Sequence, residues 1–202
     1  MTVSRRVAWP VADPVALLER AISYALGSLQ LVTAQDMSAP TPCREWNLRE
    51  LLAHMNDALE ALQEAVDDRV VALVPDEGPP NISSDPVAAL RDRACHLLGS
   101  WTGSADPAPI RIGEVPVLSD IVPSAGALEV AVHGWDVSVA CGNPRPIPAA
   151  LADELLSCAA LFVTDADRPA RFGVPVESAR DAGPGDRLLA FLGRDPSGRG
   201  TR

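Results

Sequence analysis

The hydrophobic positions of this 202-residue chain recur mostly at intervals of three and four residues, the period of a helix with one buried face. A first helix is predicted over residues 14–34, because Asp13 is a suitable N-cap and proline is favoured at the first helical position. A second helix is predicted over residues 47–70, where Asn47 and Glu50 have the spacing of a capping box.

Further along the chain, the same period predicts helices over residues 86–101, 120–141 and 149–163. Alternating isoleucine and valine over residues 107–118, around Gly113 and Glu114, predict a small hairpin. The end of the chain suggests a strand at residues 172–176, a last helical turn at 186–192, and a disordered exit from residue 193.

These elements together indicate an all-α fold, an antiparallel four-helix bundle with a small hairpin insertion and a short C-terminal appendage. The expected organisation is a flexible arm at residues 1–12, a helical bundle at 13–166, and a tail at 167–202 that packs on the bundle. A chain of this length accommodates one such domain.

Charge and composition restrict the classes of function. The net charge is −10, which disfavours a protein that wraps nucleic acid or lies on an anionic membrane. All 17 cationic side chains are arginine, which excludes lysine Schiff-base and P-loop chemistry. No apolar run has the length of a membrane span or a signal peptide, so a cytoplasmic protein is expected, with its four cysteines as free thiols.

The candidate chemistry lies in the three histidines. Glu129 and His133 project from one face of the fourth predicted helix, one turn apart, beside its apolar stripe. His54 lies at a similar flank of the second predicted helix, next to alanines that would let another helix approach closely. Two ligands one turn apart and a third from a facing helix could bind Zn²⁺ or a similar ion. The alternative is that each histidine is an ordinary surface or hydrogen-bonded core residue, as His96 is expected to be.

Two motifs resemble a known family. Residues 41–54 (TPCREWNLRELLAH) and 129–136 (EVAVHGWD) are similar to the two signatures of the mycothiol-dependent maleylpyruvate isomerase N-terminal family, one of the DinB-like metal-binding bundles. The tail, at residues 172–176 and 186–194, resembles the ending of a short actinobacterial-type branch described as metal-binding. The resemblance implies that His54, Glu129 and His133 hold a divalent metal, Zn²⁺ or another ion such as Ni²⁺. The isomerase carries a further α/β domain for which too few residues follow Gly142 here, so the metal site carries over more readily than the reaction.

Other residues near the motifs have two interpretations each. Cys43 could be a reactive thiol near a helix N-terminus, but at about 16 Å along the axis from His54 it is expected to be a packed thiol and not a shared ligand. Asp136 could hydrogen-bond the His133 imidazole, or could cap the helix or form a surface ion pair. Trp46 and Trp135 are expected to anchor the packing. An anionic substrate could be bound by arginines, for which the candidates are Arg44, Arg171 and Arg187.

The leading hypothesis is therefore a divalent-metal-dependent transferase or isomerase that acts on a small molecule, with a low-molecular-weight thiol such as mycothiol as a possible cofactor. The alternative is a non-catalytic metal-binding or stress-response module, and a DNA-binding regulator is a third and weaker hypothesis. Neither nucleic acid nor membrane is expected as a partner, and the chain could be a monomer or a homodimer. An open coordination position would favour the enzyme, and a closed four-ligand site the module.

Overall fold

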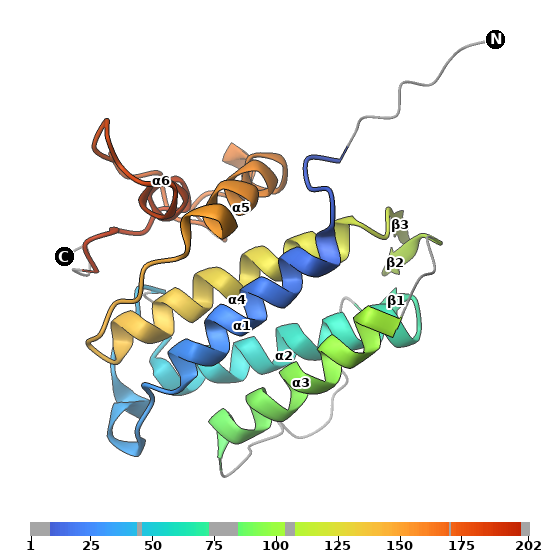
Figure 1. The fold of residues 1–202 in the computed structure, drawn as a ribbon, viewed down its shortest axis with the longest axis horizontal. Helices are drawn as coiled ribbons and strands as arrows, with labels where there is room; N and C mark the ends of the chain where they lie inside the picture. Colours follow the sequence, from blue (N-terminus) through green and yellow to red (C-terminus); the bar gives the residue numbers. More distant parts are fainter. Residues whose placement is uncertain (1–8, 44–45, 73–84, 104–107, 170, 199–202) are drawn as a thin grey trace.

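The computed structural model describes residues 9–43, 46–72, 85–103, 108–169 and 171–198. The described part is mostly helical (Figure 1), with helices α1 (Pro14–Leu29), α2 (Leu48–Asp67), α3 (Pro86–Gly103), α4 (Ile121–Ala140), α5 (Ala149–Phe162) and α6 (Pro184–Phe191). A small sheet has the order β1-β2-β3, from strands β1 (Val70–Val71), β2 (Ile110–Ile112) and β3 (Val115–Val117). None of the described helices has the length and hydropathy needed to cross a membrane.

Helices α1 to α4 pack around a common apolar core, and α5 and α6 cover the side formed by α1 and α4 (Figure 1). Strand β1 follows α2, β2 follows α3, and the two strands pair in parallel, so α2 and α3 end at the same end of the molecule. Strand β3 leads into α4, which therefore starts at that end and runs back.

Two hydrogen bonds fix the direction of α1 relative to α4. Trp9, just before α1, donates from its indole nitrogen to Ser124 near the start of α4, at 3.0 Å. Tyr24, in the second half of α1, donates from its hydroxyl to the backbone oxygen of Arg145, beyond the end of α4, at 2.6 Å. Helices α1 and α4 therefore run in one direction, and α2 and α3 run in the other.

The expectation of a mostly helical fold with a small hairpin is confirmed. The finer expectation was an antiparallel four-helix bundle, and in the structure α1 and α4 run in one direction while α2 and α3 run in the other. The first helix ends at Leu29 and not at residue 34, because Thr33 and Asp36 form a local capping box that starts a short 3₁₀ helix, Ala34–Ser38. Strand β1, which was not predicted, is only two residues long.

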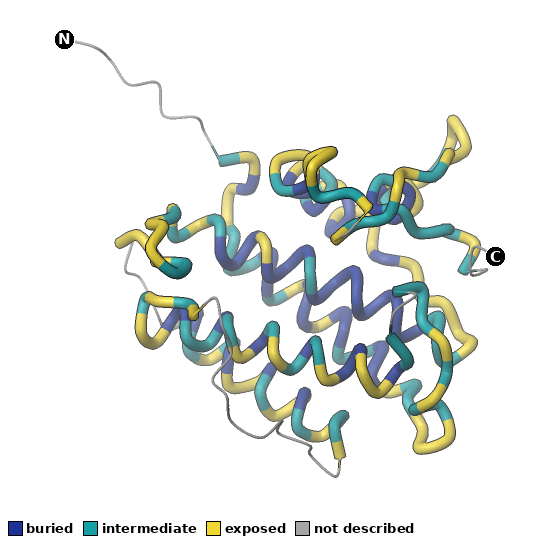
Figure 2. The backbone as a smooth tube through the Cα atoms, turned by 180° about the vertical axis from the view of Figure 1, so that it is seen from behind, coloured by how far each residue is buried: buried dark blue, intermediate teal, exposed yellow. Residues whose placement is uncertain are grey.

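Helix α4 is enclosed on almost all of its faces. Most of its residues are buried, from Val122 near its start to Ser138 near its end, and Figure 2 shows buried backbone concentrated at the centre of the molecule. Gly134 makes this possible on the side of α1, because a Cβ atom there would lie 3.0 Å from the Cα atom of Ala25. Side chains on α4 are therefore held by neighbours on several sides.

The two ends of the described chain contact the helices. Val11 is buried, and the Trp9 ring packs against Phe162, so residues 9–12 of the expected arm lie against the helices. Residues 172–176 are not a strand, and residues 193–198 form turns that continue from α6 instead of a disordered exit. Arg168 clamps this region, because its guanidinium donates to the backbone oxygens of Gly173 and Phe191.

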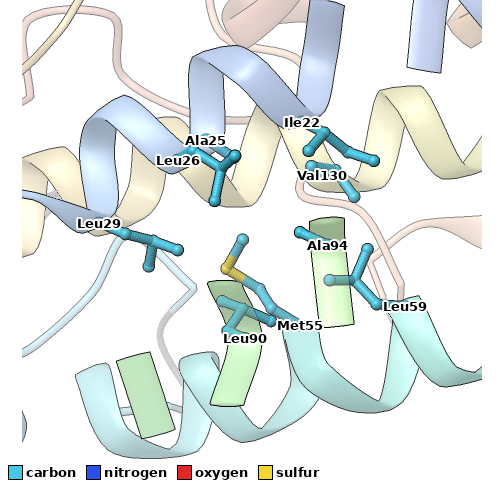
Figure 3. A pocket seen from close by; sticks show the side chains of 9 residues that line it. All are labelled: Ile22, Ala25, Leu26, Leu29, Met55, Leu59, Leu90, Ala94 and Val130. Carbon is cyan, nitrogen blue, oxygen red and sulfur yellow. The ribbon is translucent and has the colours of Figure 1, made fainter. Parts of the chain in front are cut away.

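A small apolar cavity lies between α1, α2, α3 and α4 (Figure 3). Its volume is about 10 Å³ and its lining contains no polar side chain, with Met55 and Val130 among the residues that close it. A space of this size holds one water molecule at most. This cavity is therefore too small for a substrate, and the candidate chemistry lies elsewhere on α2 and α4.

Candidate metal centre

Three potential metal ligands converge from two helices. Asn47 and Glu50 form the predicted capping box, which starts α2 at Leu48 and places His54 in its second turn. Glu129 Oε1 lies 2.5 Å from His54 Nε2 and 3.1 Å from His133 Nε2. The three donor atoms lie within 4.8 Å of one another, close enough to bind one metal ion together.

Asp136 and Arg194 support His133 from behind. His133 Nδ1 lies 2.9 Å from Asp136 Oδ2, and the Asp136 side chain is fully buried. Arg194 donates from Nε to Asp136 Oδ1 at 2.9 Å and from Nη2 to Oδ2 at 2.8 Å. Because the ring proton at Nδ1 faces the carboxylate, the Nε2 atom of His133 faces His54 and Glu129.

The Trp46 ring covers both imidazoles. Its centroid is 4.3 Å from that of His54 and 5.9 Å from that of His133. The indole thus restricts the rotation of both rings and shields one side of the group from water. Trp46 is the packing anchor that the sequence predicted, and what it packs against is the candidate site.

The ionisation states reflect competition between burial and charge. Burial lowers the pKa of His133, but Glu129 and Asp136 raise it more, to about 9. Burial raises the pKa of Glu129, but the two imidazoles hold it well below its usual range. Burial also raises the pKa of Asp136, and Arg194 and His133 lower it further than burial raises it. Without a metal, the group is therefore two carboxylates held by a protonated His133 and by Arg194.

This donor set fits a divalent cation. Two imidazole nitrogens and one carboxylate oxygen are typical ligands of Zn²⁺, which binds them at about 2.0–2.2 Å, and small side-chain movements would suffice for that spacing. The His133 side chain is only 7% exposed, whereas His54 and Glu129 are 34% and 35% exposed. One side of the group is thus embedded in the protein, and the opposite side is open to solvent.

The structure distinguishes between the other candidates. Of the two interpretations of Asp136, the hydrogen bond to His133 is the one observed. Cys43 is half-buried and is not part of the converging group. Arg171 and Arg187 form exposed pairs with acidic residues on the surface, and His96 is exposed on α3. Arg44 lies outside the described residues.

Arg194 is the site residue that the sequence analysis missed. It was assigned to a disordered end, although Gly193 after an apolar helical turn is a typical helix C-terminal signal that predicts an ordered turn there. Nothing in the local pattern indicated that the next side chain reaches Asp136, 58 positions earlier in the chain.

Comparison with known proteins identifies the family of the chain. The sequence profile of the mycothiol maleylpyruvate isomerase N-terminal domain matches residues 18–138, more than half of the chain. The chain belongs to this family. The matched segment contains the three converging residues and Asp136, and it ends before Arg194.

Two relatives cover nearly the same length as this chain. Both are uncharacterised proteins of Mycobacterium tuberculosis, one from strain CDC 1551 and one from strain H37Rv. Each is 29% identical over 187 residues, which is 90% of this chain and 98% of the relative. No solved structure matches the chain.

Proposed function

We propose that this protein is a divalent-metal-dependent transferase or isomerase that uses a low-molecular-weight thiol, such as mycothiol, on a small electrophilic molecule. The observation that carries the proposal is the convergence of His54, Glu129 and His133 donor atoms within 4.8 Å, with a solvent-open side. The family name supports the thiol and the isomerase-related chemistry.

The donor set favours Zn²⁺, and Ni²⁺ or another divalent ion would also suit two nitrogens and a carboxylate. When bound, such an ion would lower the pKa of a coordinated thiol, so that the thiol is present as the nucleophilic thiolate at neutral pH. With a divalent ion present, the two carboxylates and Arg194 leave one positive charge at the site uncompensated. An anionic thiolate would neutralise that charge.

The residues around the site would orient the reacting groups. Asp136 holds the proton at Nδ1 of His133, which leaves Nε2 as the donor atom. Trp46 lies against both imidazoles and excludes water from that side. Substrate and thiol would approach from the opposite side, where His54 and Glu129 are exposed.

The alternative is a non-catalytic metal-binding module, in which four protein ligands would close the site. Three donors converge among the described residues, and two of their side chains are one-third exposed. This openness favours the enzyme.

The test is to load metal-free protein with Co²⁺ and titrate mycothiol or a related thiol while the visible spectrum is recorded. We expect one ion per chain, and a spectral change that follows the ionisation of the thiol. His54→Ala and Glu129→Ala should each reduce metal occupancy sharply, whereas the control His96→Ala changes an exposed histidine on α3 and should retain it. Full metal occupancy in both site variants would show that the ion binds elsewhere. A Co²⁺ spectrum that no thiol changes would refute the transferase and favour the module.

A further inference from the structure

We infer that Arg194 is a positioning residue of the metal centre, which orients His133 through Asp136. The turn after α6 then belongs to the site and is not only a tail packed on the helices. The inference rests on the metal-binding function proposed above. It extends the site beyond residues 18–138, the segment that matches the family profile.

The contact with Asp136 has the geometry of an orienting device. Three hydrogen bonds join the guanidinium to the carboxylate, with Nε at 2.9 Å from Oδ1 and 3.2 Å from Oδ2, and Nη2 at 2.8 Å from Oδ2. The same Oδ2 atom faces His133 Nδ1 at 2.9 Å. The carboxylate therefore cannot rotate without breaking contacts on both sides, so the planar fork of Arg194 sets the plane in which His133 is held.

The contact between Asp136 and Arg194 is shielded from water. The Asp136 side chain is fully buried and that of Arg194 is 11% exposed, so water has little access to replace either partner. Glu129 places a second carboxylate on the other side of His133, at 3.1 Å from Nε2. When His133 is neutral because it binds a metal, the Arg194 guanidinium still compensates the negative charge of Asp136.

The turn that carries Arg194 is constrained by its backbone. Gly193 has a φ of 79° and ends α6, and the backbone nitrogen of Arg194 donates to the oxygen of Leu189 at 2.9 Å. A Cβ atom on Gly193 would lie 2.5 Å from the backbone of Gly173. Only glycine permits both the left-handed conformation and this close approach, so the direction of Arg194 is determined by the packing of the tail.

The competing explanation is that Arg194 merely attaches the tail to α4. The two explanations differ in what they predict for the bound ion. Attachment alone affects the stability of the fold, whereas a positioning role also affects the affinity for the ion and the electronic spectrum of its ligand field.

The experiment compares Arg194→Met with Arg187→Met in the full chain, using Co²⁺ as the probe. Arg187 lies on α6 and pairs with Asp153 at 3.3 Å on the surface, so its substitution removes the same charge without touching the site. We expect Arg194→Met to weaken Co²⁺ binding by about 10- to 100-fold, the usual effect of losing a residue that orients a metal ligand, and to shift the visible bands. Arg187→Met should match the wild type in both measurements.

Two further variants keep the test decisive if Arg194→Met does not fold. Arg194→Lys retains the charge without the fork and should bind Co²⁺ with altered bands, and Gly193→Ala should do the same because it displaces the turn. Wild-type affinity and bands in the variants that fold, even with a lowered melting temperature, would overturn the positioning role. If wild-type protein binds no Co²⁺ at all, the proposed metal function fails first and this inference falls with it.

Discussion

Metal uptake by the metal-free protein should release a proton from His133. The metal-free pKa of this imidazole is about 9, because the attraction of Glu129 and Asp136 outweighs the effect of burial, which lowers it. Only the unprotonated Nε2 atom can bind a metal. At pH 7, two pH units below this pKa, about one molecule in a hundred is ready to bind.

The expected magnitude follows from the same value. Apparent affinity for Zn²⁺ or Co²⁺ should rise about tenfold per pH unit between pH 6.5 and 8.5, and the affinity lost at pH 7 is on the order of 100-fold. Linkage predicts an opposite effect on the metal-free fold. Because the folded pKa of His133 is raised, its contribution to stability is fully present below about pH 6.5 and disappears as the pH rises through 9, a loss on the order of 3 kcal/mol.

The assay is calorimetry of Co²⁺ binding in buffers of different ionisation enthalpy, which counts the released protons. The pKa can be measured directly by ¹⁵N NMR, because the chain has only three histidines and His54→Gln and His96→Gln would assign them. We expect about one proton released per ion at pH 7 and a His133 titration near pH 9. A His133 that titrates near 6.5, or binding that is independent of pH, would refute the electrostatic reasoning.

Three other outcomes follow from the packing. Gly134→Ala should lower the free energy of unfolding by about 1–3 kcal/mol in urea, because the added Cβ atom would press on Ala25. The control Gly99→Ala, which has open space around it, should stabilise α3 by about 0.5–1 kcal/mol. Equal effects of the two substitutions would contradict the close approach of α1 and α4. Co²⁺ should quench part of the tryptophan emission, and Trp46→Phe should remove that part, since the Trp46 ring centroid lies 4.3 Å and 5.9 Å from those of the two site imidazoles. Quenching that survives the substitution would place the ion elsewhere. Asp136→Asn should lower the free energy of unfolding by about 3–5 kcal/mol, because it leaves a buried guanidinium unpaired, and a loss below 1 kcal/mol would show that water reaches it.

Much of the helical fold was predictable because its signals are local. The capping box of α2, the N-cap and proline at the start of α1, and the Gly113-Glu114 turn each depend on neighbours within four residues. The convergence of His54 with Glu129 and His133 could be predicted because each residue lies on a recognisable helix face within a motif. Whether those three residues bind a metal in solution stays a prediction.

The rest depended on contacts between distant segments. The directions of α2, α3 and α4 follow from which strands pair, and strand β1, with two residues, is too short to leave a pattern. The contact between Arg194 and Asp136 requires α6 to fold onto the molecule and Gly193 to turn the chain back. No periodicity in the sequence carries that information.

The enclosure of α4 has a consequence for the kinetics of exchange at the site. Amide hydrogens of a helix buried on nearly every side exchange only when much of the molecule opens, so Glu129 and His133 share the slowest motions of the fold. His54 lies on α2, and its side chain is one-third exposed. An ion leaving the proposed centre would therefore separate first from the exposed side chains of His54 and Glu129 and last from His133, so the residence time of the ion would be governed by side-chain motion and not by the much slower opening of α4.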